Sequence, residues 1–333
     1  MTTPTKVQLD NPEGVLSVVP LLLGYQPGPG NVVLLGLNDR GRAAVTANFR
    51  QPLEASDLDA LGESVEMMRR QAGVESAIIV GYGDGQQVTP SVDVLRDAAA
   101  SRGVGLRDAL RAEGDRYWSY TCEDTSCCPP EGRQFQADTE ASTKLRVEAG
   151  ASAEPSRDDI AARFAAPTGP EAEAAQQAWA AAPRPDFAAG RRVIDQALAD
   201  CHDAKPLSTE QAAGIAAALT RIATRDYAWA HMAPEQADEY SGLWASVMRH
   251  IPAEAAAAPA SLLAFCSWQR GDGATANLAV DRALETTPNY SMARLLGSAL
   301  QAGAPPSAAI LPMTPEEVIA SYEPQADYDL EAS

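Results

Sequence analysis

The chain has 333 residues, 45% of them hydrophobic and 21% charged, so it can build a sizeable core and is not globally disordered. Its 26 Lys and Arg residues against 45 Asp and Glu residues give a net charge of −19. A surface of this sign repels a phosphate backbone, which excludes nucleic acid as the expected partner. At roughly 150 residues per domain, the length predicts two domains.

The cysteine content and the absence of a long apolar segment predict where the protein is found. The longest apolar stretch near the start, residues 15–24, is too short to cross a bilayer and has no signal-peptide cleavage pattern. Five cysteines are an odd number for a secreted protein. We therefore expect a cytoplasmic protein with reduced thiols and without a membrane partner.

The first third of the chain alternates helix and strand signals. Residues 12–23 are typical of a helix, because Asn11 before them is a favourable N-cap residue. The continuous apolar run at 32–37 indicates a strand buried on both faces. A four-residue loop at 38–41 joins it to the alternating pattern of 43–49, which predicts an antiparallel hairpin.

The same alternation continues to the middle of the chain. Further strands are expected at 76–82, 104–112 and 116–121, and helices at 55–72 and 90–102. Helices that connect strands, together with two hairpins, predict an α/β domain over residues 1–150, in which a mixed sheet is flanked by helices.

The second half of the chain reads as helix throughout. Residues 151–173 are rich in Ala, Pro, Ser and Gly and are interpreted as a linker or domain edge. An all-α, repeat-like domain is predicted over 174–321, followed by an acidic tail at 322–333. The helices of this half are expected at 171–182, 186–201, 208–224, 235–250, 259–270, 274–286 and 289–301.

One helical pair carries the most specific pattern of the chain. Residues 262–289 resemble a tetratricopeptide repeat, a unit of two helices joined by a turn. The matching positions are Leu263 and Ala264 in the first helix, Gly271 and Asp272 at the turn, Ala276 and Ala283 at the helix crossing, and Pro288 at the end. The resemblance covers one repeat.

This pattern predicts how the last helices pack. The small residues should form the crossing of the pair, and helix 289–301 should stack on it through Met292, Leu295 and Leu296. A partner peptide is expected to bind in the groove beside helix 259–270.

The densest chemistry lies in residues 117–132, YWSYTCEDTSCCPPEG, with Cys122, Cys127 and Cys128 near two carboxylates. We interpret this block first as a structural turn with buried or capping thiols, in which at least two sulfur atoms lie within about 6 Å of each other. A redox-labile disulfide ranks second. A metal site ranks last, because a zinc site needs four ligands and only one cluster is present. We therefore assign no metal and no cofactor.

Two loops at strand ends are candidate ligand-binding segments. They are residues 24–31 and the glycine-rich residues 81–87, and each lies between a strand and a helix. They supply the candidate residues Tyr25, Gln26, Asn31, Tyr82 and Asp84. Backbone N–H groups in such a loop can face an anion, but no Lys follows and Asp84 would repel a phosphate. A flexible loop is the simpler interpretation. No His lies beside a Ser or Cys in a recognisable arrangement, so we assign no catalytic residue.

Three stretches of the chain are together similar to a family of actinobacterial proteins catalogued as a domain of unknown function. They are residues 18–37, 117–132 and 268–296, which cover both halves of the chain. The resemblance carries over no activity, cofactor or catalytic residue. It implies that the cysteine block and the PLLLGYQP segment at residues 20–27 are features of the family.

These observations predict a non-catalytic interaction or regulatory protein that uses its helical domain to bind a protein partner, with its oligomeric state left open. The alternative is an enzyme or small-ligand-binding protein whose site lies at the loops of the α/β domain near the cysteine turn. A closed pocket where the two candidate loops and the cysteine turn meet would favour the alternative.

Overall fold

The structure, a computed structural model, describes residues 9, 11–38, 43–50, 55–72 and 74–322. The chain divides into two units. The first takes the chain up to Asp159 together with Ala302–Pro305, and the second holds Ile160–Gln301 and the residues from Pro306 on. The division falls within the segment 151–173. The acidic tail expected at 322–333 lies, after Tyr322, outside the described residues.

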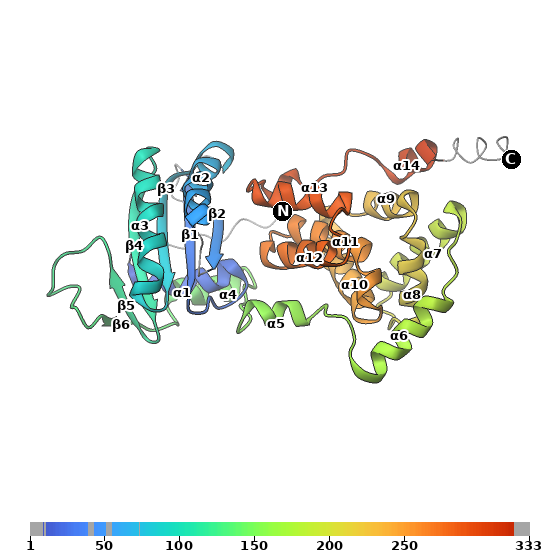
Figure 1. Cartoon of the computed structure of the whole chain (residues 1–333), viewed down its shortest axis with the longest axis horizontal. Helices are drawn as coiled ribbons and strands as arrows, with labels where there is room; N and C mark the ends of the chain where they lie inside the picture. Colours follow the sequence, from blue (N-terminus) through green and yellow to red (C-terminus); the bar gives the residue numbers. More distant parts are fainter. Residues whose placement is uncertain (1–8, 10, 39–42, 51–54, 73, 323–333) are drawn as a thin grey trace. The chain divides into compact units, whose positions relative to one another are not determined.

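The described part of the first unit contains one six-stranded sheet in the order β2-β1-β3-β4-β5-β6 (Figure 1). Its strands are β1 (Asn31–Asn38), β2 (Ala43–Arg50), β3 (Val74–Tyr82), β4 (Gly105–Glu113), β5 (Arg116–Ser119) and β6 (Arg133–Gln134). The pair β3–β4 is parallel and the other pairs are antiparallel. The predicted mixed sheet is confirmed, while the loop predicted at 38–41 lies, after Asn38, outside the described residues.

Strand β1 is buried from its first residue to Leu37, as its unbroken apolar run predicts. Successive side chains of a strand point to opposite faces of the sheet. Val32 and Leu34 accordingly join the core on one face, and Val33 and Leu35 join the core on the other. Helices α2 (Ala55–Ala72) and α3 (Gly85–Ser101) cover the first of these faces, and α1 (Pro12–Leu23) covers the second (Figure 1).

The side-chain caps set where the helices of this unit begin. The carboxamide of Asn11 accepts a hydrogen bond of 2.7 Å from the Gly14 backbone N–H, so α1 begins where the sequence predicts. The prediction of a helix over 90–102 was wrong at its start. Asp84 caps α3 by accepting from the Gln86 backbone N–H at 2.8 Å, and the helix already begins at Gly85.

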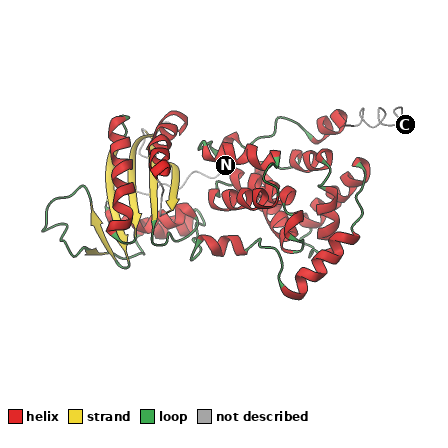
Figure 2. Cartoon of the chain, viewed as in Figure 1, coloured by secondary structure: helices red, strands yellow, loops and turns green. Residues whose placement is uncertain are grey.

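The second unit consists of helices in its described part (Figure 2). They are α6 (Gly169–Ala181), α7 (Phe187–His202), α8 (Thr209–Ala218), α9 (Ile222–Ala230), α10 (Ala237–Arg249), α11 (Ala257–Gln269), α12 (Gly273–Thr286), α13 (Ser291–Gln301) and α14 (Pro315–Tyr322). The single helix predicted at 208–224 is two helices. The hydroxyl of Thr220 donates to the Ala217 carbonyl at 2.7 Å, which satisfies an orphan carbonyl at the end of α8.

Three helices lie outside the ranges that the sequence predicted. They are α4 (Glu140–Glu148), α5 (Arg157–Ala162) and α14. Helix α4 begins at a capping box in which Thr139 and Ser142 each accept from the other's backbone N–H. The sequence pattern did not predict this helix, because only Ser142 and Leu145 are buried in it and its other residues form no apolar face.

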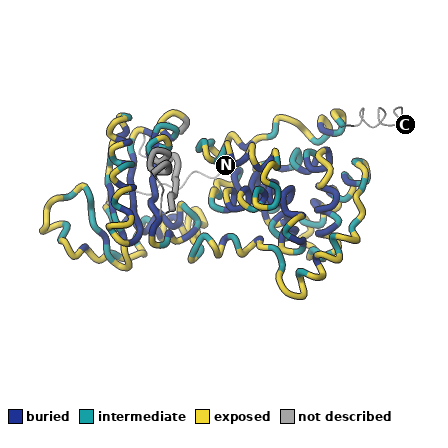
Figure 3. Tube along the Cα trace, in the orientation of Figure 1, coloured by how far each residue is buried: buried dark blue, intermediate teal, exposed yellow. Residues whose placement is uncertain are grey.

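Helices α11 and α12 pack against each other around the turn at Gly271, whose φ of 76° lies in the left-handed region, as predicted. Each residue of α11 from Ala257 to Trp268 is buried (Figure 3). This corrects the expectation that a partner peptide binds beside helix 259–270, because the helix leaves no face uncovered. Met292 and Leu296 of α13 are buried as expected, but Leu295 is 59% exposed, so its predicted packing role was wrong.

Candidate functional site

Two features of the described residues offer chemistry or a binding surface. One is the cysteine turn, residues 119–132, between β5 and β6 of the sheet unit. The other is an open cavity between helices of the second unit.

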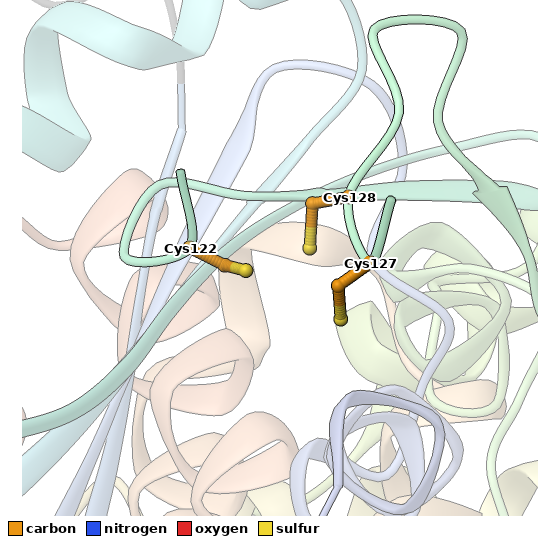
Figure 4. Close-up of side chains that lie close together, drawn as sticks. All are labelled: Cys122, Cys127 and Cys128. Carbon is orange, nitrogen blue, oxygen red and sulfur yellow. The ribbon is translucent and has the colours of Figure 1, made fainter. Parts of the chain in front are cut away.

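The thiols of Cys122, Cys127 and Cys128 converge on one point of the cysteine turn. Figure 4 shows the three side chains close together, with the thiols of Cys122 and Cys128 pointing into the gap between them and the thiol of Cys127 pointing to one side of it. The three Sγ atoms lie within 4.8 Å of one another, closer than the sequence predicts. Cys127 is exposed and the other two are half-buried.

Hydrogen bonds hold the two arms of this turn in place. On the first arm, the Ser119 hydroxyl accepts from the Cys122 backbone N–H at 3.2 Å. On the second arm, the Asp124 carbonyl accepts from the backbone N–H groups of Cys127 and Cys128, at 3.0 and 2.6 Å. The Asp124 carboxylate accepts from the Ser126 hydroxyl at 2.7 Å and from the Ser126 backbone N–H at 2.8 Å, and these bonds lower the pKa of this carboxyl. The turn therefore presents the three thiols through fixed backbone.

The neighbouring thiols affect the protonation of Cys128. Burial, together with hydrogen bonds with the thiols of Cys122 and Cys127, raises the pKa of Cys128 to about 12. The Arg133 guanidinium donates to the Cys127 carbonyl at 3.2 Å, and its Nη1 lies 3.9 Å from the Cys127 Sγ. One positive charge thus lies beside the cluster of three thiols.

An aromatic clamp closes the base of the turn. The Trp118 indole N–H donates to the Pro130 carbonyl at 2.8 Å. A Cβ on Gly132 would lie 2.5 Å from the Trp118 ring, so only glycine allows this approach, and its φ of 77° also favours glycine. The guanidinium of Arg111, a residue of β4, lies 3.6 Å from the centre of the same ring.

The two candidate ligand loops lie against each other in the sheet unit. The Gly30 backbone N–H donates to the Tyr82 carbonyl at 2.7 Å, and a Cβ on Gly83 would lie 3.1 Å from the Pro29 Cα. The Arg111 Nη1 also lies 3.4 Å from the Gly83 carbonyl oxygen. The loops therefore connect, through Arg111, to the aromatic clamp of the cysteine turn.

Most of the candidate residues in these loops have structural contacts. The Asn31 side-chain amide donates to the Gly28 carbonyl at 2.7 Å, and Asp84 caps α3. Tyr25 is buried and forms an isolated bridge with Glu154, and the Gln26 backbone N–H donates to the Glu154 carbonyl at 2.9 Å. Tyr82 is buried and its hydroxyl has no hydrogen-bond partner among the described residues, and burial raises its pKa.

An open cavity of about 780 Å³ lies between α7, α8 and α10 of the helical unit. We call it the α7–α8–α10 groove. Its apolar lining includes Val193, Ala197, Leu207, Ile215 and Leu243. Gly214 of α8 and Gly242 of α10 also line it, and a Cβ at either glycine would meet no atom within 4 Å. A glycine inside a helix costs about 1 kcal/mol relative to Ala.

Charged side chains frame this groove. Asp200, Asp238 and Glu239 line it, together with Arg192 and Lys205. The Lys205 ammonium lies 2.7 Å from the Asp200 carboxylate, which lowers the pKa of that carboxyl. The Cys201 thiol also lines the groove and donates to the Glu239 carbonyl at 3.5 Å. Burial raises the pKa of Cys201.

Sequence reasoning missed this groove. Its lining comes from three helices and the segment after α7, which the packing of the unit brings together. The signal that could have indicated it is the pair of glycines within helices, Gly214 and Gly242, since an interior glycine needs a packing or functional reason.

Comparisons with known proteins identify a family. A family model described as a domain of unknown function (DUF4192) matches residues 12–307. No curated protein and no solved structure matches the chain. Among the described residues, no helix combines the length and the apolar character that crossing a membrane requires.

Proposed function

We propose that this chain, which belongs to the DUF4192 family, is a non-catalytic interaction protein that binds a protein partner through its helical unit. The observation that carries the proposal is the α7–α8–α10 groove, an apolar cavity that two interior glycines leave open. Open apolar surface on a folded protein is costly to keep and is typical of binding sites.

The lining of the groove indicates what kind of segment binds there. Its apolar floor suits the apolar face of an amphipathic helix, which is a common way for a peptide to dock in a groove. The chain carries a net charge of −19, and three carboxylates line the groove against two cations. We therefore propose a partner helix whose apolar face is flanked by Lys or Arg, since this charge would steer it to the groove.

The contacts of the candidate loops support this proposal over an enzyme or ligand site in the sheet unit. Asp84 and Asn31 are engaged in a helix cap and a loop hydrogen bond, and the Tyr82 hydroxyl is buried. These side chains stabilise the junction of the two loops. Helices α11 and α12, whose residues 262–289 resemble a tetratricopeptide repeat, belong to the same unit, and α11 packs against α10, which lines the groove. A cytoplasmic location is part of the proposal, because all five cysteines are free thiols.

The test fills the groove in the full-length chain. A Cβ at Gly242 or at Gly214 would meet no atom within 4 Å, so Gly242→Leu and Gly214→Leu should extend a side chain into the groove, retain the fold and exclude the partner. Ala174→Leu, on an exposed position of α6, is the matched control. Affinity capture from the native host, followed by mass spectrometry, should yield proteins that the wild type and Ala174→Leu retain and both glycine variants lose.

A purified candidate from that set should then bind the wild type in solution, with an affinity at least tenfold weaker for Gly242→Leu. Salt should weaken the binding, because charges at the groove are partly exposed. Equal capture by the wild type and both glycine variants would show that the partner binds elsewhere, and the groove proposal would be wrong.

A further inference from the structure

The cysteine turn gathers three thiols that the proposed groove does not use. We propose that Cys122, Cys127 and Cys128 bind one Zn²⁺ ion as thiolates and leave its fourth coordination position to a ligand from outside the turn. The site lies in the sheet unit and does not depend on the groove.

The geometry of the turn is close to what zinc requires. In a tetrahedral site with Zn–S bonds of about 2.3 Å, two sulfur atoms lie about 3.8 Å apart. The three Sγ atoms already lie within 4.8 Å of one another, and the three side chains come from the two arms of one turn (Figure 4). A contraction of at most about 1 Å therefore completes three ligand positions. Rotation of the exposed Cys127 side chain can supply it without moving the hydrogen-bonded backbone.

Packing alone does not explain three convergent thiols at this place. Cys266 shows what a structural cysteine looks like in this chain, since it is completely buried and contacts the Met232 thioether at 3.4 Å. The cysteine turn, in contrast, lies at the surface, and Cys127 is exposed. Three small side chains gain little from burial there. A disulfide would use two of the three sulfur atoms, whereas a metal ion uses them all.

The charges of the turn also favour a cation. When the ion binds, three S–H bonds break, three Zn–S bonds form, and three protons pass to solvent, with no change of oxidation state. The product carries a charge of about −1, which the Arg133 guanidinium beside Cys127 offsets.

The donor set leaves one position open. Among the described His, Cys, Asp and Glu residues, the group that shares this space consists of the three cysteines alone. The nearby Asp124 carboxylate accepts from Ser126 and is committed to the turn. Zinc sites with three protein ligands keep their fourth position for water, a substrate or a partner's side chain. Soft thiolate ligands select Zn²⁺, Cu⁺ or iron–sulfur clusters, and a single four-coordinate ion that needs no redox step is Zn²⁺.

The first experiment measures metal in the full-length protein. The chain is reduced, stripped with a chelator and titrated with Co²⁺ without oxygen, since Co²⁺ reports tetrahedral thiolate sites by its absorption. We expect an intense thiolate-to-cobalt band that saturates at one ion per chain and that Zn²⁺ abolishes. Cys122→Ser and Cys128→Ser should weaken binding at least tenfold, while Cys201→Ser, a half-buried thiol of the helical unit, should bind like the wild type.

A second measurement, on the wild type, tests the site even if a serine variant fails to fold. X-ray absorption of the zinc-loaded wild type should show three sulfur ligands and one light-atom ligand. Addition of 2-mercaptoethanol should then change the visible bands of the cobalt form, because the fourth position exchanges. Absence of the charge-transfer band in the reduced wild type, or an undiminished band in Cys128→Ser, would overturn the zinc site. Four sulfur ligands before the thiol is added would overturn the open position.

Discussion

His231 illustrates how one side chain depends on its surroundings. The imidazole lies at the C-terminal end of α9 with its ring centre 4.7 Å from that of Tyr227. Its Nε2 atom is buried and has no hydrogen-bond partner among the described residues. Burial lowers the pKa of His231, although the carboxylates of Asp195 and Glu316 oppose this shift. The folded protein therefore favours the neutral ring.

A pH dependence follows from this lowered pKa. In the unfolded chain the ring binds a proton below about pH 6.5, while the folded chain still resists it, so acid favours unfolding. The contribution of His231 to the free energy of unfolding is complete above about pH 6.5. It is lost as the pH falls through the lower pKa that His231 has in the folded protein. We expect the free energy of unfolding to fall more for the wild type than for His231→Phe between about pH 8 and about pH 5. Urea denaturation at both pH values measures it, and equal losses in the two proteins would contradict the prediction.

The three sulfur atoms of the cysteine turn show how much of a site the spacing of its residues predicts. Their closeness could be predicted, because at most five residues separate these cysteines along the chain and a turn limits how far their side chains can separate. The orientation of the three thiols relative to one another could not be predicted. It depends on Asp124 and Ser119, which orient the two arms by hydrogen bonds that spacing alone does not reveal.

Secondary structure elements were predictable where hydrophobic pattern and caps agreed. Strand β1 and helix α1 have both signals and lie where expected. The start of α3 was missed because Pro90 looked like a first-turn residue, whereas the Asp84 cap begins the helix five residues earlier. Leu295 was misplaced because α13 packs through Met292 and Leu296, and Gly297 lets α13 approach Val280 of α12.

The contact between α11 and α12 gives a prediction at this scale. Ala276 of α12 is completely buried, as are Ala264 and Ala283 to within 1%. Ala276→Leu adds three carbon atoms at this crossing and should lower the free energy of unfolding by about 1–3 kcal/mol. Chemical denaturation measures the change, with Ala174→Leu on exposed surface as the control. A variant as stable as the control would show that the two helices do not cross at these small residues.

The whole molecule divides its candidate functions between two units. The cysteine turn belongs to the sheet unit, and the α7–α8–α10 groove belongs to the helical unit. The sequence predicts two such parts from its change of pattern after about residue 140. It does not predict the groove, because a cavity depends on how three separate helices pack.

This division predicts that damage to one unit stays within it. Gly190 of α7 approaches α9 so closely that a Cβ would lie 2.6 Å from the Thr224 Oγ1, and Thr224 is itself completely buried. Gly190→Ala should therefore overpack this contact and destabilise the helical unit by about 1–3 kcal/mol. Local opening free energies follow the cooperative unit to which a residue belongs. Hydrogen exchange measured by mass spectrometry should become faster in peptides from α7 and α9 and stay unchanged in peptides from β1 and β3.

The control for this experiment is Gly242→Ala, which meets no atom within 4 Å and should leave exchange in α7 and α9 unchanged or slower, because Ala is the better helix former. Faster exchange in β1 and β3 of Gly190→Ala would mean that the two units unfold together. The cysteine turn and the groove would then be energetically coupled, and binding at one would change the stability of the other. Unchanged hydrogen exchange in β1 and β3 would mean that the core of each unit stabilises that unit's candidate site independently of the other.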